Sequence, residues 1–242
     1  MGNLEKVSFA DGYQKMIERQ KEIYGEFEED IIGVQKNGLR PNMPDYHGGY
    51  SICWRHDDDI IEKVKGVADN VGSYVGSLIY DNKNTVHSTI TYIAFGAPDL
   101  YEEQKMDLMV RMVENVASVL KKPLIDYTKW LMNYDTVIAA GLADKNFYYS
   151  ARMIVGACRK LGLDLRMPWG SHITAARFLE KKNGNEVSDL INYVKQVKPV
   201  GKSKMSLLEV CKTEYQKNEG VKFMFIRVLG FRLKIVLCFF YD

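Results

Sequence analysis

The stretch VHSTITYI at residues 86–93 and the stretch SHITAARF at residues 171–178 share one short pattern that decides the predicted fold. Each places a histidine two residues before a threonine, His87 with Thr89 and His172 with Thr174, in an apolar run typical of a strand. Residues i and i+2 of a strand project from the same face, about 7 Å apart, so each motif presents an imidazole beside a hydroxyl. We interpret the two copies as an internal duplication, which predicts two lobes whose histidines meet across a cleft.

The paired motifs suit the hydrolysis of a cyclic phosphodiester. That reaction takes a proton from water and gives one to the departing sugar oxygen, and two imidazoles that titrate near neutrality can share these tasks. Each threonine hydroxyl can donate to a non-bridging phosphate oxygen as charge grows there. The scheme requires no metal and no cofactor. A lone His-x-Thr in a strand is more often structural, and it is the second copy that favours catalysis.

The segments His87–Ile90 and His172–Ala175 resemble the twin His-x-Thr/Ser-hydrophobic signatures of the two-histidine (2H) phosphoesterase superfamily, which includes LigT-like RNA 2′,3′-cyclic phosphodiesterases. Arg177 also matches a basic position common in LigT-like second motifs. The resemblance spans roughly residues 49–215. It implies an α+β, bilobal fold with two antiparallel-rich sheets, outer helices and a central cleft. It also implies metal-independent cleavage of cyclic or 2′–5′ phosphodiesters, with Arg177 among the substrate-binding residues.

The rest of the chain alternates between helical and strand-like segments, which predicts an α/β or α+β protein. Residues 25–48 are acidic and then rich in Gly, Pro and Asn, and we expect a long loop there. The expected organisation is an N-terminal helix and loop extension at 1–48, a single bilobal domain at 49–230 and an apolar tail at 231–242. Helices are expected at about 8–24, 58–71, 99–120, 145–161 and 186–197, and strands at 49–54, 77–80, 86–95, 124–127, 131–139, 163–166, 171–179, 204–213 and 221–229.

Aromatic residues near the motifs are candidates for stacking on a base. Trp169 lies three residues before His172, and Tyr50 and Trp54 alternate on the strand expected at 49–54. Core packing is the alternative for all three, and the pattern favours it for Tyr50 and Trp54. The lysines after the second motif are expected to form a solvated face or, alternatively, to contact an RNA backbone: Lys181, Lys182, Lys195, Lys198, Lys202 and Lys204.

Other polar residues are assigned structural roles. The run Asp57–Asp59 opens a predicted helix, where the helix dipole favours acids, so we expect capping rather than metal binding. His47 and His56 are expected to be solvated or to cap a helix. Tyr92 and Phe178 are assigned to the core. The tail is too short to span a bilayer, and we expect a buried or edge strand, with membrane-surface contact or a C-terminus foreign to the parent fold as alternatives.

Composition narrows the class of protein. Apolar residues make up 46% and charged residues 26%, as in ordinary globular proteins, and the net charge of +2 argues against duplex DNA as a partner. The four cysteines form no CxxC pair, which indicates reduced thiols rather than a disulfide scaffold or structural zinc. The first residues carry no apolar segment of the signal-peptide type. We therefore expect a cytoplasmic monomer without a transmembrane segment, whose partner is a nucleotide or an RNA end carrying a phosphodiester.

Alternatives to a phosphodiesterase stay open at this stage. The same fold could serve as a catalytically weak nucleotide- or RNA-binding module. The chain could also be a structural protein whose helix at 8–24 docks on a partner. The motifs do not choose among a 2′,3′-cyclic phosphate, a 2′–5′ linkage and a cyclic nucleotide, and they do not say which histidine is the acid.

Overall fold

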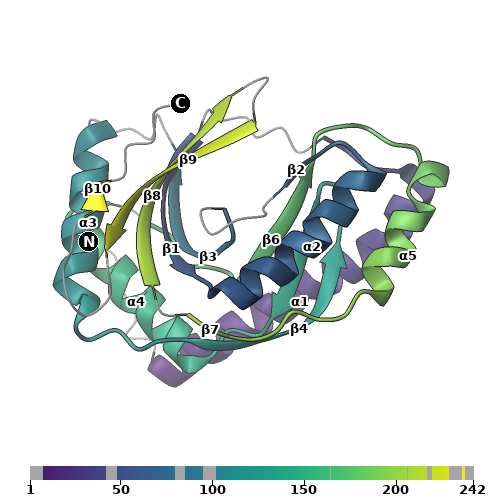
Figure 1. Ribbon diagram of the computed structural model, residues 1–242. Coiled ribbons are helices and arrows are strands. Elements are labelled where there is room, and N and C mark those ends of the chain that lie inside the picture. Colours follow the sequence, from purple (N-terminus) through teal and green to yellow (C-terminus); the bar gives the residue numbers. More distant parts are fainter. Residues whose placement is uncertain are drawn as a thin grey trace.

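Two five-stranded sheets with helices around them form the architecture of the computed structural model (Figure 1). The structure describes residues 8–41, 48–79, 85–94, 102–163, 165–205, 207–216, 220–228 and 236–237. The first sheet has the strand order β10-β9-β8-β1-β3 and the second has β2-β6-β5-β4-β7, with every neighbouring pair antiparallel. The predicted α+β class, with two antiparallel sheets and outer helices, is confirmed.

The strands of the first sheet are β1 (Gly48–Arg55), β3 (His87–Ala94), β8 (Leu207–Gln216), β9 (Gly220–Val228) and β10 (Val236–Leu237). Those of the second are β2 (Ser77–Ile79), β4 (Leu124–Met132), β5 (Thr136–Gly141), β6 (Ser171–Phe178) and β7 (Gly201–Lys204). The helices are α1 (Phe9–Asn37), α2 (Asp58–Tyr74), α3 (Glu102–Ala117), α4 (Lys145–Lys160) and α5 (Ser188–Gln196), with a 3-10 turn at Gly184–Glu186.

Helices cover the sheets because each has one apolar stripe to bury. Helices α2 and α5 pack on the second sheet, and α3 packs on β1, β8 and β9 of the first. Helix α2 is capped by Asp57, whose side chain accepts a hydrogen bond from the backbone N–H of Ile60, as the capping assignment predicts. The described helices include none with the length and apolar character that a bilayer crossing demands.

Helix α1 is longer than the sequence pattern predicts, since the loop expected from residue 25 is helical up to Asn37. The buried side chains of Tyr24 and Val34 continue the apolar stripe through the acidic segment, and Gly38, with φ of 79°, ends the helix. Helix α1 packs on β4 of its own chain. Its buried Gln20 donates to the carbonyls of Gly141 and Ser171, at the ends of β5 and β6.

Three other segments differ from the expectation. Strands β4 and β5 form a hairpin in which Asn133 Oδ1 accepts from the N–H groups of Asp135 and Thr136, so the strand expected at 131–139 is interrupted by a turn. The segment expected as a strand at 163–166 has no strand in its described residues. The single strand expected at 204–213 is two strands, β7 and β8. The division into an extension, a bilobal domain and a tail stays a prediction.

Candidate active site

The two motifs meet where β3, an edge strand of the first sheet, lies against β6 of the second. The Ser88 hydroxyl, one residue after the first histidine, donates to the backbone carbonyl of His172 at 2.8 Å. His87 and Thr89 on β3 and His172 and Thr174 on β6 are all half-buried, while the residue between each pair is buried. Each motif thus turns its imidazole and hydroxyl to one face of its strand, as the spacing predicts.

Strand β6 carries a β-bulge directly after its threonine, and the bulge brings a further side chain to the motif face. Ala175 is the extra residue of β6 in its pairing with β5. Ala175 and Ala176 are both fully buried, so the alternation resumes one step out of phase. Arg177 therefore shares a face with His172 and Thr174, although the odd spacing of five would place it on the opposite face of a regular strand.

The first motif strand repeats this device at the same position. Ile90 is the extra residue of β3 in its pairing with β1, and Ile90 and Thr91 are both buried. Tyr92 therefore turns to the motif face, in the position that Arg177 occupies in the second motif. It is half-buried, and its ring lies so close to Gly49 that a Cβ there would collide with it. The core role expected for Tyr92 is wrong, and the spacing it shares with Arg177 is the sequence signal that identifies it.

The environment of His87 favours a neutral ring. Its Nδ1–H donates to the Thr85 carbonyl at 2.7 Å, so in the neutral ring the lone pair lies on Nε2. Burial lowers the pKa of His87 to about 3, and the positive charge of Arg55 acts in the same direction. His172 and Arg177 also lower this pKa, so the charged groups of the second motif lie within electrostatic range of the first.

The second histidine is held by an aromatic stack. Trp169 lies parallel to the His172 imidazole, with centroids 4.4 Å apart and planes 12° from parallel, and Tyr24 of α1 meets Trp169 edge-on. Burial lowers the pKa of His172 to about 4, with Arg177 as the second cause. His172 Nδ1 is buried and has no hydrogen-bond partner among the described residues. Because an unsatisfied buried polar atom costs about 1–3 kcal/mol, a water or ligand atom at Nδ1 would stabilise this arrangement.

A buried tyrosine joins the serines that flank the two histidines. Ser88 follows His87 and Ser171 precedes His172, and Tyr127 Oη lies 2.8 Å from Ser88 Oγ and 3.0 Å from Ser171 Oγ. A hydroxyl carries one proton, and Ser88 donates its own to the His172 carbonyl. Tyr127 must therefore donate to Ser88, and Ser171 must donate to Tyr127. The chain of donors fixes the backbone of one motif against the other.

His56 extends this network, so the solvated or capping role expected for it is wrong. Its ring is 6% exposed, with Nδ1 2.8 Å from Ser203 Oγ and Nε2 3.2 Å from Ser88 Oγ. Because the Ser88 proton points to the His172 carbonyl, Nε2 of His56 must be the donor, and Nδ1 accepts from Ser203. Burial lowers the pKa of His56 to about 3, with the charge of His87 as the second cause, so this ring is neutral at pH 7.

A buried ion pair flanks the first motif. Arg55 is the direct partner of His87 in the register of β1 and β3, and its side chain pairs with Glu209 of β8. Arg55 also donates to the Val86 carbonyl at 3.3 Å. The guanidinium therefore supports the backbone just before His87 and places a fixed positive charge beside it.

The other sequence candidates lie away from the motif face. Tyr50 and Trp54 are 2% and 3% exposed and belong to the hydrophobic core, in agreement with the packing role that the pattern favours. Lys202 and Lys204 are exposed on β7, at the opposite edge of the second sheet from β2 and β6. His47 lies outside the described residues.

Comparison with known proteins supports the fold. No family model and no curated protein sequence matches the chain. The crystal structure of TT0787 from Thermus thermophilus aligns with a TM-score of 0.51 and 13% identity, covering 76% of this chain and 100% of that one. The chain folds like TT0787.

Two structures of E. coli LigT also align with the chain. The apo form has a TM-score of 0.48 and 12% identity, and the complex with 3′-AMP has 0.45 and 9%. Each alignment covers 74% of this chain and 94% of LigT. LigT and TT0787 are members of the 2H phosphoesterase superfamily, and with TT0787 the resemblance predicted from the motifs is confirmed at the level of the fold.

Proposed function

We propose that the chain is a phosphodiesterase that hydrolyses a cyclic phosphate or a 2′–5′ phosphodiester of RNA or of a small nucleotide, by metal-independent acid and base catalysis. The observation that carries this proposal is the contact of β3 with β6 between the two sheets, each strand with its imidazole, hydroxyl and bulge-directed side chain on one face. An anion between the strands would meet two imidazoles, two hydroxyls and one guanidinium. These are the donors that a phosphodiester needs as charge develops on its oxygens.

His87 is the base in this proposal. Its Nδ1–H is held by the Thr85 carbonyl, so Nε2 of the neutral ring can accept a proton from water. The low pKa keeps His87 neutral at pH 7 and ready for this step.

His172 is the acid. Its pKa of about 4 is the higher of the two, so it is the first of the pair to be protonated. An imidazolium is also favoured by the face of an aromatic ring, and Trp169 offers that face. A bound phosphate anion stabilises the charged form further, because an opposite charge raises the pKa of a histidine. Trp169 thus serves the acid, in place of the base-stacking role expected from its position in the chain.

Thr89, Thr174 and Arg177 bind the phosphate. The hydroxyls donate to its non-bridging oxygens, and Arg177 attracts the anion and compensates its charge. Since the same cation lowers the pKa of both histidines, substrate binding relieves that effect as the phosphate neutralises Arg177.

The direct test is to incubate the protein in EDTA with 2′,3′-cyclic mononucleotides, 2′–5′ dinucleotides and cyclic dinucleotides and to identify the products. The proposal expects one class to be hydrolysed, and His172→Ala to abolish turnover. Tight binding of a nucleotide without any turnover would favour the binding module instead.

The assignment of acid and base has its own test. A nucleotide p-nitrophenyl phosphodiester has a leaving group that needs little protonation, so it should restore His172→Ala much more than His87→Ala. Preferential rescue of His87→Ala would reverse the assignment. Equal rescue of both variants would remove it.

A further inference from the structure

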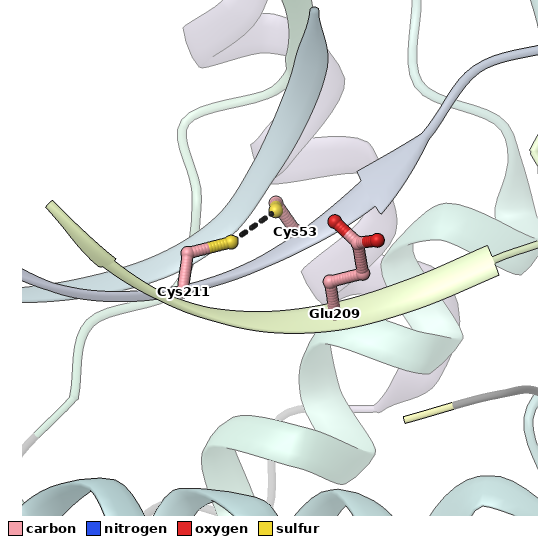
Figure 2. A group of neighbouring side chains, drawn as sticks. All are labelled: Cys53, Glu209 and Cys211. Atoms are coloured by element: carbon pink, nitrogen blue, oxygen red, sulfur yellow. Dashed lines mark hydrogen bonds between the residues drawn. The ribbon is translucent and has the colours of Figure 1, made fainter. Parts of the chain in front are cut away.

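Two thiols and a carboxylate form a buried cluster in the first sheet, separate from the proposed catalytic groups. Cys53 of β1 and Glu209 of β8 are direct partners in the register, and Cys211 follows Glu209 by two residues, so the three side chains share one face. Figure 2 shows both residues of β8 pointing to the side where Cys53 lies. The two sulfurs are 3.2 Å apart, and both lie within 4.8 Å of a carboxylate oxygen. None of the three is more than 1% exposed.

We propose that Cys53, Cys211 and Glu209 bind a divalent metal ion of the zinc class. Two thiolates and a carboxylate are ligands that Zn²⁺ accepts, and soft sulfur donors select it over Mg²⁺ or Ca²⁺. In a tetrahedral site, two sulfurs that are each about 2.3 Å from the ion lie about 3.8 Å apart, so the two sulfurs, now 3.2 Å apart, need to separate by only about half an ångström. The pairing of β1 with β8 holds all three donors on rigid strands.

Arg55 supplies the support that a metal-binding carboxylate requires. Its guanidinium pairs with Oε2 of Glu209. A carboxylate has two oxygens with several lone pairs, so one group can accept from a guanidinium and still bind a cation, and such outer contacts orient metal ligands.

The charges of the cluster also balance. With neutral thiols, the pair of Arg55 and Glu209 gives a net charge of zero. A divalent ion that replaces the two thiol protons, which pass to solvent, leaves the net charge at zero, so a dry site need not bury an uncompensated charge.

The position of the cluster gives the ion a structural role. Cys53 is the register partner of Thr89, and Arg55 that of His87, so the cluster lies beside the first motif on the same sheet face. A metal that joins β1 to β8 would stabilise this part of the sheet, while the proposed acid and base contribute no ligand. The inference therefore does not rest on the proposed phosphodiesterase activity.

Cd²⁺ is the probe for this site, because thiolate–cadmium bonds absorb in the ultraviolet. The reduced full chain, stripped of metal, is titrated with CdCl₂ and then with ZnCl₂ in competition. We expect one equivalent of Cd²⁺ to bind with this absorption band and with the release of two protons, and Zn²⁺ to displace it. Bound metal should raise the melting temperature, as any ligand of the native state does.

Matched cysteine variants locate the ligands. Cys53→Ser and Cys211→Ser should lose the band, whereas Cys158→Ser, which changes a buried thiol of α4, should keep it. Glu209→Gln keeps both thiols and should weaken Cd²⁺ binding at least tenfold. The inference is overturned if the folded, reduced wild-type chain binds no stoichiometric Cd²⁺, if the band persists without Cys53 and Cys211, or if these two thiols form a disulfide under the same conditions.

Discussion

Removing one oxygen atom, in Tyr127→Phe, tests whether the buried network sets the geometry of the paired histidines. Tyr127 is fully buried, and its hydroxyl donates to Ser88 at 2.8 Å and accepts from Ser171 at 3.0 Å. A buried hydrogen bond contributes about 0.5–1.5 kcal/mol net, so the loss of two predicts about 1–3 kcal/mol lower stability. A displacement of 1 Å at reacting groups can cost about 10²-fold, and for the smaller relaxation here we expect kcat to fall roughly tenfold with KM nearly unchanged. Urea unfolding and steady-state kinetics on the substrate that the product assay identifies measure the two effects separately, with Tyr148→Phe of α4 as the control for a buried tyrosine away from the motifs. A folded Tyr127→Phe with wild-type kcat would refute the positioning role, even if its stability fell as expected.

The remaining predictions concern the phosphate donors, pH and chelation. Thr89→Ala and Thr174→Ala each remove one donor to the phosphate. Each change should raise the activation barrier that kcat/KM measures by about 2–4 kcal/mol. Near-normal rates in both variants would mean that neither hydroxyl binds the phosphate in the transition state. Because kcat/KM reports the free enzyme, and because burial lowers the pKa values of His87 and His172 to about 3 and 4, the fraction with a protonated acid grows as the pH falls. We therefore expect kcat/KM to rise from pH 8 toward pH 5, and an optimum at or above pH 7 would contradict the reasoning. Turnover per folded molecule should persist in EDTA, and activity that returns only with an added divalent ion would exclude the metal-independent mechanism.

Acid should also destabilise the fold, since His56, His87 and His172 are all buried or half-buried with lowered pKa values. Below about pH 6.5 the unfolded chain binds protons that the native chain does not, so stability falls with pH down to about 3–4. The pH profile of activity is therefore read only over the range in which circular dichroism shows a folded protein.

The catalytic candidates could be predicted from the sequence because local rules determine them. The period of two in a strand puts His87 with Thr89 on one face, and His172 with Thr174 on one face, whatever the rest of the chain does. The duplication adds a second constraint, since two copies of a pattern predict two similar strands.

The bulges at Ile90 and Ala175 could not be read from that period. A bulge depends on how two strands pair, and a periodic pattern assumes regular pairing. A regular period therefore puts Tyr92 in the core, and only the family resemblance points to Arg177. The correspondence of position between Tyr92 and Arg177 becomes informative only when the two motifs are compared with each other.

Long-range partners explain the errors at His56 and in α1. His56 follows a strand and precedes a helix cap, which locally favours solvent, yet Ser88 and Ser203, far along the chain, enclose its ring. The acidic segment after Tyr24 has many charges and two glycines, but its helix is stabilised by apolar contacts that only the folded sheet supplies. The cluster of Cys53 with Cys211 is likewise a product of the register of β1 and β8.

The most direct test of the central claim is the kinetics of His87→Ala, His172→Ala and the double variant on one identified phosphodiester. If the histidines act as one unit, each single change should remove most of kcat, and the double variant should be little worse than the worse single variant. Losses that multiply in the double variant would mean two independent contributions. Full activity in a folded His172→Ala would contradict the claim that the two motifs form one active site.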